Sequence, residues 1–399
     1  MKQFDNAIST PITSSASFSY KSSKEAEEIF SGNCNKPLYS RMGNPTSSIL
    51  EQQVSKMENG VAAVATSSGM GAISMVIMAL CKTGDEIISV GGLFGGSYAL
   101  MEQTLPRFGI ATHFLGVDEL EKIEENINEN TKIIFCESIG NPSLRLPDMK
   151  KIGDIATKHG IIFIVDNTIT PVVVKPIELG ADIVVYSTTK ILTGNSSALG
   201  GIAVFKGVEK GDKFHSSRYG FLQPFIKKLG SRALVGCSKK RALRDFGMSA
   251  NANSSYQTLL GMETLHLRNE RINSSCEIVA NILKKEGVCV NHPCLEEHTD
   301  HQLYKKMYPN GCGSMITIDM GTKEKAFKFL DSSKLLTLTA NIGDSRTLGL
   351  HMASTIYSDF DGEQKEFLGI SDGLIRISIG LEDTELICED LISCYKASK

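Results

Sequence analysis

The feature that most constrains the fold is a series of short apolar runs that alternate with helix-length segments between about Gly60 and Phe205. Four of these runs are rich in β-branched residues and apolar almost throughout. They cover Glu86–Val90, Lys132–Ser138, Ile161–Asn167 and Asp182–Ser187. Strands that are covered by helices on both faces have this composition, whereas strands with one wet face alternate. The pattern therefore predicts an α/β fold built on a large, mostly parallel sheet.

Beyond about Leu243 the texture changes to a long helical stretch around Leu259–Gly287, followed by short strand-like runs. This predicts a smaller C-terminal α+β domain over residues 243–399, after a main α/β domain over residues 46–242. The first residues are rich in Ser and Thr with few apolar periodicities, which is typical of an extended segment. We therefore predict an N-terminal arm over residues 1–45.

Composition excludes several function classes. The chain has 399 residues, 41% of them apolar, and a net charge of -3, so it carries no basic field that would attract nucleic acid. No apolar run approaches the roughly 18 to 20 residues needed to span a bilayer, and the polar opening with Asp5 does not resemble a signal peptide. The ten cysteines contain no CxxC pair, which indicates reduced thiols. These features predict a cytoplasmic enzyme without a membrane partner.

A lysine at the end of a buried strand needs an explanation, because burying its charge is costly. Lys190 follows Ser187 and Thr189 at the end of one apolar run, and Asp166 ends the preceding run. Both would lie at the carboxyl edge of the sheet, where α/β proteins build their sites. They could form an ion pair, or they could anchor pyridoxal phosphate (PLP) as a Schiff-base lysine and a partner of the pyridine nitrogen. The chain has no GxGxxG or Walker motif, which disfavours dinucleotide and P-loop sites.

The following segments occur in order along the chain: PLYSRMGNPT, SSGMGAI, ESIGNP, IVDNT, YSTTK, ALGG, GMETLHLRNER, NIGDSRTLGLHMAST and GISDGLIRISIGLED. Together they resemble, over nearly the whole chain, the Cys/Met-metabolism (trans-sulfuration) family of PLP enzymes. The resemblance implies the PLP-dependent transferase fold type I and PLP as cofactor. It implies that Lys190 binds the cofactor covalently and that Asp166 holds the pyridine nitrogen. The implied phosphate contacts are Ser187, Thr189 and the backbone of Gly69 and Met70, and Asn141 matches a residue near the phenolic oxygen.

The resemblance also implies contacts to substrate and to a second subunit. Arg376 matches the arginine that binds the substrate α-carboxylate, for which its planar fork is better suited than a lysine. Tyr39 and Arg41 match a pair that reaches the phosphate of the neighbouring subunit. The arm would then be an interface element, and the expected assembly is a homotetramer whose active sites are shared across a dimer.

Phe94 departs from the family pattern, since most members have a tyrosine stacked on the cofactor ring at this position. Phenylalanine keeps the stacking area but lacks the hydroxyl that helps to protonate the leaving group. Tyr98 or Tyr39 could supply the proton instead, and acetate needs less protonation than a thiolate. Gly96 stands where methionine γ-lyases typically have a cysteine.

Ala340 and Asn341 stand where cystathionine enzymes carry a glutamate and a serine, which argues against cystathionine chemistry and places Asn341 in the substrate site. The resemblance therefore favours γ-replacement on O-acetylhomoserine by sulfide, giving homocysteine. The alternatives are a methionine γ-lyase, which releases methanethiol, 2-oxobutyrate and ammonia, and a non-catalytic PLP-binding protein. Lys190, Asp166 and Arg376 are all present, which counts against the non-catalytic alternative.

A histidine-rich stretch could be taken for a zinc site, with His292, Cys294, His298 and His301 as ligands. The family has a similar loop without a metal. The resemblance therefore implies that the protein binds no metal.

Overall fold

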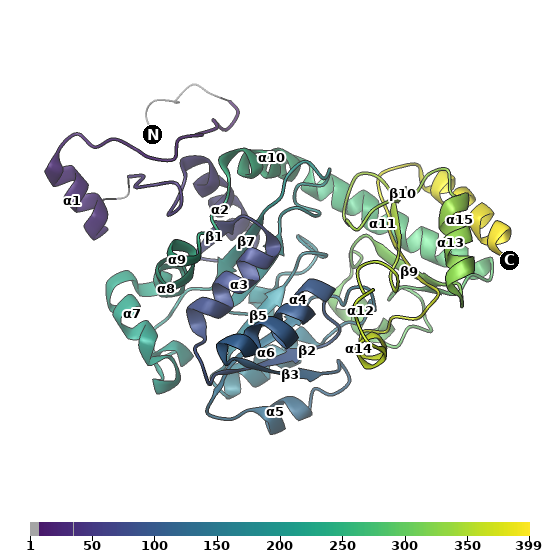
Figure 1. The fold of residues 1–399 in the computed structure, drawn as a ribbon, viewed down its shortest axis with the longest axis horizontal. Coiled ribbons are helices and arrows are strands. Elements are labelled where there is room, and N and C mark those ends of the chain that lie inside the picture. The colour runs from purple at the N-terminus through teal and green to yellow at the C-terminus, as the bar shows by residue number, and fades with distance from the viewer. Residues whose placement is uncertain (1–7, 35) are drawn as a thin grey trace.

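The computed structural model describes residues 8–34 and 36–399 and contains two sheets (Figure 1). The larger sheet has seven strands in the order β1-β7-β6-β5-β4-β2-β3. They are β1 (Ala62–Thr66), β2 (Glu86–Val90), β3 (Ala111–Leu115), β4 (Thr131–Glu137), β5 (Ile162–Asp166), β6 (Ile183–Ser187) and β7 (Gly201–Phe205). Strands β2 to β6 pair in parallel, and β7 lies antiparallel between β6 and β1. The predicted α/β fold class is confirmed.

The strands of this sheet are buried on both faces, as their composition predicted. In β5, Ile162 and Ile164 enter one hydrophobic core, whereas Phe163 and Val165 enter the core on the opposite face. The first core also contains residues of α3 (Gly69–Leu80) and α8 (Ala233–Ser238). The second contains residues of α2 (Pro45–Met57) and α6 (Met149–Lys158).

The smaller sheet has five strands in the order β10-β11-β12-β9-β8. They are β8 (Val290–Asn291), β9 (Met315–Asp319), β10 (Thr337–Leu338), β11 (Leu348–His351) and β12 (Leu374–Ser378). Its core includes side chains from α11 (Leu265–Lys285), α13 (Lys323–Ser332) and α15 (Thr384–Ser398). The predicted domain boundaries remain predictions, although each predicted domain contains one of the two sheets.

One predicted helix is interrupted. The stretch expected to be continuously helical divides into α10 (Ala252–Glu263) and α11, because Thr264 leaves the helical conformation with φ -111° and ψ 9°. The other helices are α1 (Ser23–Ser31), α4 (Gly95–Ala99), α5 (Lys122–Asn126), α7 (Gln223–Leu229), α9 (Arg244–Phe246), α12 (His301–Met307) and α14 (Gly362–Phe367). None of the helices in residues 8–34 and 36–399 is long and apolar enough to cross a membrane.

The N-terminal segment is extended, with α1 set apart from the rest of the molecule in Figure 1. Phe30, on α1, is a large apolar side chain that is 69% exposed. The predicted arm also includes residues 1–7 and 35, which lie outside the described part of the chain.

Candidate active site

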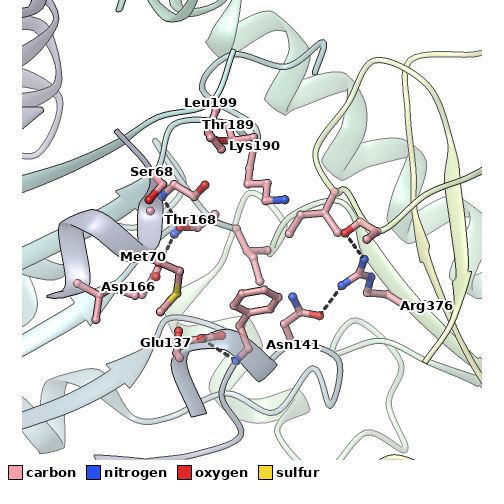
Figure 2. A pocket seen from close by; sticks show the side chains of 18 residues that line it. Ser68, Met70, Glu137, Asn141, Asp166, Thr168, Thr189, Lys190, Leu199 and Arg376 are labelled. Atoms are coloured by element: carbon pink, nitrogen blue, oxygen red, sulfur yellow. Dashed lines mark hydrogen bonds between the residues drawn. The ribbon is translucent and has the colours of Figure 1, made fainter. Parts of the chain in front are cut away.

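A cavity of about 250 Å³ lies where β4, β5 and β6 end and where β12 and the segment between β10 and β11 approach (Figure 2). Its lining consists of Ser68, Gly69, Met70, Ile73, Phe94, Ser97, Glu137, Asn141, Asp166, Thr168, Ile169, Ser187, Thr189, Lys190, Leu199, Ala340, Ile342 and Arg376. Most of the residues that the sequence singled out are therefore brought together here. Asn341 contacts Lys190 but does not itself line the cavity, and Tyr39 and Arg41 lie elsewhere.

Lys190 follows directly after β6 and its turn, and its side chain points into the cavity (Figure 2). Its Nζ donates a hydrogen bond to Asn341 Oδ1 at 2.6 Å. Burial lowers the pKa of Lys190 to about 8, and the positive charge of Arg376 acts in the same direction. With such a pKa, about a tenth of the lysine is neutral near pH 7, and this neutral amine can act as a nucleophile or base.

Two carboxylates meet at another side of the cavity. Asp166 on β5 and Glu137 on β4 are directly opposite in the parallel register. Burial raises the pKa of Asp166 to about 6, although hydrogen bonds from Thr168 oppose the shift. Burial and the neighbouring charge of Asp166 raise the pKa of Glu137 well above its usual value. Neither carboxylate pairs with Lys190 among the described contacts, so the simple ion pair that the sequence left open is not formed.

The N-terminus of α3 opens onto the cavity and is suited to an anion. Ser68 caps the helix by accepting a hydrogen bond from Gly71 N at 3.0 Å. A Cβ atom on Gly69 would lie 2.7 Å from Ser187 Cβ, so only glycine allows β6 to come this close. Free N–H groups and the helix dipole favour a phosphate at such a position. Thr189 also faces the cavity, while its hydroxyl exchanges hydrogen bonds with Gly200.

Arg376 lies within β12 and is only 2% exposed. Its guanidinium donates to Asn141 Oδ1 at 3.1 Å and to the Ala340 carbonyl at 3.0 Å (Figure 2). All its described partners are neutral, and burial lowers its pKa to about 10. A buried guanidinium without a carboxylate partner is the arrangement expected for binding a carboxylate from a ligand.

Phe94 precedes α4, and its backbone N–H donates to Glu137 Oε1 at 2.8 Å. Its ring lines the cavity, and a Cβ atom on Gly96 would lie only 2.7 Å from that ring. Tyr98, which we considered as a replacement proton donor, is not in the cavity lining. Its ring packs against Phe114 at a centroid distance of 4.7 Å, within an aromatic cluster. That suggestion for Tyr98 is therefore wrong for this conformation.

Tyr39 and Arg41 lie on the N-terminal segment outside the cavity of their own chain. Tyr39 is 43% exposed, and the Arg41 guanidinium lies 5.6 Å from the centre of its ring. Arg41 also donates to the Arg244 carbonyl at 2.6 Å. Both side chains are accessible to a second subunit, as the predicted contact across a dimer requires.

The sequence did not assign several lining residues, notably Ser68, Thr168 and Glu137. Each lies within a quoted motif, SSGMGAI, IVDNT or ESIGNP, that also contains an assigned residue, namely Gly69, Asp166 or Asn141. The available signal was therefore their position at a strand end or helix start. Their polar side chains gave no sign of facing the cavity.

The histidines of the histidine-rich stretch contact other protein groups. Burial lowers the pKa of His292 to about 3, and its Nε2 lies 3.5 Å from Cys312 Sγ. His298 Nδ1 accepts from the Asp300 N–H, and His301 Nδ1 lies 3.0 Å from the Pro293 carbonyl. Within the described residues, no three His, Cys, Asp or Glu side chains are grouped so that they could hold a metal.

Comparison with known proteins gives the family. The model of the Cys/Met metabolism PLP-dependent enzymes matches residues 1–396. The chain belongs to this family. It is 35% identical to the homocysteine synthase of Schizosaccharomyces pombe, over 97% of this chain and 94% of that protein. It is 33% identical to the O-acetyl-L-homoserine sulfhydrylase of Leptospira meyeri, over 97% and 92% of the two chains. It is also 33% identical to an L-methionine gamma-lyase of Fusobacterium nucleatum, over 98% and 94%.

A solved structure agrees with this membership. The putative O-acetylhomoserine (thiol)-lyase of Campylobacter jejuni superposes with a TM-score of 0.89 at 31% identity, covering 98% of this chain and 96% of that one. That structure contains a pyridoxyl-lysine phosphate. As a member of the Cys/Met metabolism family, this protein is a PLP-dependent enzyme.

The residues present fit this cofactor. Lys190 and Asp166 have no ionic partner for their charges among the described residues, so both are available to a ligand. The cradle at Gly69, which a Cβ atom would fill, lies at a helix N-terminus suited to the phosphate. The cavity thus combines an amine, a carboxylate and an anion site, which are the three kinds of group that PLP requires.

Proposed function

We propose that this enzyme replaces the γ-substituent of O-acetylhomoserine by sulfide, giving homocysteine and acetate. The observation that carries the proposal is that Lys190 and Arg376 are the only cationic side chains in the described cavity lining. Lys190 is reserved for the cofactor, and Arg376 for the substrate α-carboxylate. No cation of this chain is then left for a second negative group, which favours an uncharged acetyl ester over a succinyl or phosphoryl ester.

The proposed cofactor contacts follow from the lining. Lys190 would bind PLP covalently, Asp166 would hold the pyridine nitrogen and Phe94 would stack on the ring. The proposed phosphate contacts are Ser187, Thr189 and the backbone of Gly69 and Met70, with Ser68 as an addition from the structure. When bound, PLP supplies an electron sink that stabilises negative charge at the substrate Cα.

Arg376 would bind the α-carboxylate through both nitrogens of its fork, with Asn141 keeping the guanidinium in place by the 3.1 Å hydrogen bond. Lys190, released when the substrate amine takes its place, would remove the Cα proton and carry protons between the reacting carbons. Its pKa of about 8 suits a group that must both take up and release protons. Since Phe94 has no hydroxyl, the leaving acetate would depart without a proton from this position.

A methionine γ-lyase is the second candidate, because such a protein is among the relatives. The contact between Gly96 and the ring of Phe94 favours replacement instead. The Cβ atom of a cysteine at position 96 would lie 2.7 Å from the ring of Phe94, so the cysteine typical of γ-lyases does not fit here unless Phe94 moves. A non-catalytic role is disfavoured because Lys190 and Arg376 both face the cavity.

A product assay tests the reaction. Purified holoenzyme is given O-acetyl-L-homoserine with and without sulfide, and L-methionine alone in parallel. We expect homocysteine only when both O-acetylhomoserine and sulfide are present. Methanethiol and 2-oxobutyrate formed from methionine at a higher rate would overturn the proposal in favour of the γ-lyase.

We further propose a cytoplasmic homotetramer in which Tyr39 and Arg41 complete the phosphate site of the neighbouring subunit. The exposure of both side chains and the extended arm support this arrangement. Mixing Lys190→Ala chains with Arg41→Ala chains tests it, since a hybrid dimer would contain one site with both residues intact. Recovery of activity on mixing is expected, and two variants that stay inactive together while forming mixed oligomers would contradict shared sites.

A further inference from the structure

A chain of hydrogen bonds leads from Lys190 through the exposed Ser196 to the buried carboxylate of Asp344. Lys190 Nζ donates to Asn341 Oδ1 at 2.6 Å, and Asn341 Nδ2 donates to Ser196 Oγ at 2.8 Å. Ser196 Oγ in turn donates to Asp344 Oδ2 at 2.5 Å. A hydroxyl has one proton, so a serine that donates to Asp344 must accept from its other neighbour. The amide of Asn341 therefore turns its NH₂ to Ser196 and its oxygen to Lys190.

The carboxylate at the end of this chain is fixed in its acceptor state. Asp344 is only 1% exposed, and its Oδ1 accepts from Arg346 Nε at 2.7 Å and from the Arg346 N–H at 3.0 Å. Although burial opposes ionisation, hydrogen bonds from Arg346 and Ser196 hold the pKa of Asp344 below its usual value. An ionised Asp344 cannot donate, so it dictates the direction of every hydrogen bond that follows.

Ser196 is held in place by its backbone. Its φ of 58° lies in the left-handed region, which non-glycine residues seldom adopt and which is often retained at functional sites. The loop before it is tied to the Asp344 segment, because Ser345 N donates to the Gly194 carbonyl at 2.9 Å. The Asn195 carbonyl also accepts from Arg346 at 3.4 Å. These ties place the Ser196 hydroxyl between Asn341 and Asp344.

We propose that Ser196 is a positioning residue that orients Asn341 and, through it, the free amine of Lys190. Asn341 is uncharged, so it holds the amine without stabilising the ammonium form as a carboxylate would. The amine is thereby kept at a fixed place while it is not bound to the cofactor. This inference rests on the proposed role of Lys190 as the cofactor lysine, and it assigns Ser196, which lies outside the cavity lining, a part in the reaction.

The test measures the rate at which the full-length, cofactor-free chain captures PLP, followed by the absorbance change of the cofactor over a range of pH. The plateau rate at high pH reports the position of the neutral amine, and the apparent pKa reports its charge. We expect Ser196→Gly to lower the plateau rate about three- to tenfold, the effect of losing one oriented hydrogen bond. Glycine is chosen because it tolerates the left-handed backbone. The matched control is Ser197→Ala in the same loop, whose hydroxyl makes no described hydrogen bond.

A second variant separates position from charge. Asn341→Asp keeps the shape of the side chain but adds a negative charge beside Lys190, so the apparent pKa of capture should rise by about one unit. Arg376, Asp166 and Glu137, the charged groups lining the same cavity, are unchanged in all these variants. In the holoenzyme, Ser196→Gly should lower kcat and leave KM nearly unchanged.

The outcomes are distinguishable. If Ser196→Gly and Ser197→Ala capture PLP at the parental rate with the parental pH profile, Ser196 has no positioning role. If Asn341→Asp leaves the apparent pKa unchanged, the amide does not hold the amine. If Lys190→Ala still becomes covalently labelled at one site after reduction with PLP, the proposed function itself fails, independently of Ser196.

Discussion

The two walls of the cavity are built in different ways. On the large-sheet side, Asp166 and Lys190 lie at or just beyond the ends of parallel strands, where loops present side chains to a ligand. On the small-sheet side, Arg376 lies in the middle of β12, between Thr317 of β9 and Leu350 of β11 in an antiparallel ladder. Asp166 and Lys190 thus stand at the edge of a sheet, whereas Arg376 is fixed within a strand. This difference agrees with the proposed roles, in which the first wall carries the chemistry and the second wall binds the substrate carboxylate.

The largest effect on activity should come from a substitution on the large-sheet side of the cavity. Lys190→Ala is expected to lower kcat by about 10³-fold or more, because the chain would lose both its covalent anchor and its proton carrier. The measurement is homocysteine formation by the PLP-reconstituted variant under single-turnover conditions. Retained fold is checked by thermal unfolding, and an activity within tenfold of the parent would contradict the assignment of chemistry to this wall.

A substitution on the small-sheet side should change substrate binding more than the rate of the chemical step. Arg376→Ala is expected to lower kcat/KM about 10- to 150-fold, the value of hydrogen bonds to a charged group, mostly through KM. Arg376→Lys is the matched variant, since it keeps the charge and loses the fork, and it should recover only part of the affinity. A loss confined to kcat would show that Arg376 acts on the chemical step. This result would contradict the assignment of substrate binding to the small-sheet side.

Gly96 tests how closely the ring of Phe94 must fit. A Cβ atom on Gly96 would lie 2.7 Å from that ring, so Gly96→Ala should displace the ring and weaken PLP retention by about tenfold. PLP retention is measured by dialysis followed by the cofactor absorbance. Gly220→Ala is the control, because a Cβ atom there has no heavy atom within 4 Å. Equal retention in both variants would mean that the ring moves aside freely.

The smallest expected effect concerns stability and pH. Burial raises the pKa of Asp166 to about 6, so its contribution to the free energy of unfolding becomes unfavourable as pH rises from about 4 to 6. Asp166→Asn should therefore stabilise the cofactor-free chain by about 1–2 kcal/mol at pH 7 and by little near pH 4. Thermal unfolding at the two pH values measures this. An equal shift at both values would show that the charge of Asp166 is not the cause.

Much of the large-sheet wall could be predicted from the sequence. The β-branched run Glu86–Val90 coincides with β2, and the end of β6 was placed correctly at Ser187. Site residues just beyond such runs are local in the sequence, so the position of Lys190 follows from the end of one strand. The family motifs then added Arg376 and Asn141, which no local pattern connects to the cavity.

Other features depended on packing that the sequence does not display. Lys190 and Asn341 are 151 positions apart, and their contact requires the two sheets to meet. Tyr98 is near Phe94 in sequence, but its ring packs in an aromatic cluster with Phe114 and Phe360. These two residues come from other segments of the chain, so the sequence around Tyr98 does not show the cluster. The break at Thr264 was also missed, since the residue at the break is neither glycine nor proline and Gly261 lies three residues earlier, inside α10.

The placement of Lys190 and Arg376 on different structural units has a consequence for the geometry of the reaction. In the proposed complex these residues hold the amine side and the carboxylate of the same substrate Cα, so the separation of the two units sets how that carbon is oriented. The hydrogen bond between Ser345 N and the Gly194 carbonyl joins those units, and neither residue lines the cavity, although Gly194 N donates to the Lys190 carbonyl. Changes at this joint would tilt the Cα–H bond relative to Lys190 while leaving every group around the substrate intact. The rate of proton removal is thus open to mutations that touch neither the substrate nor the cofactor.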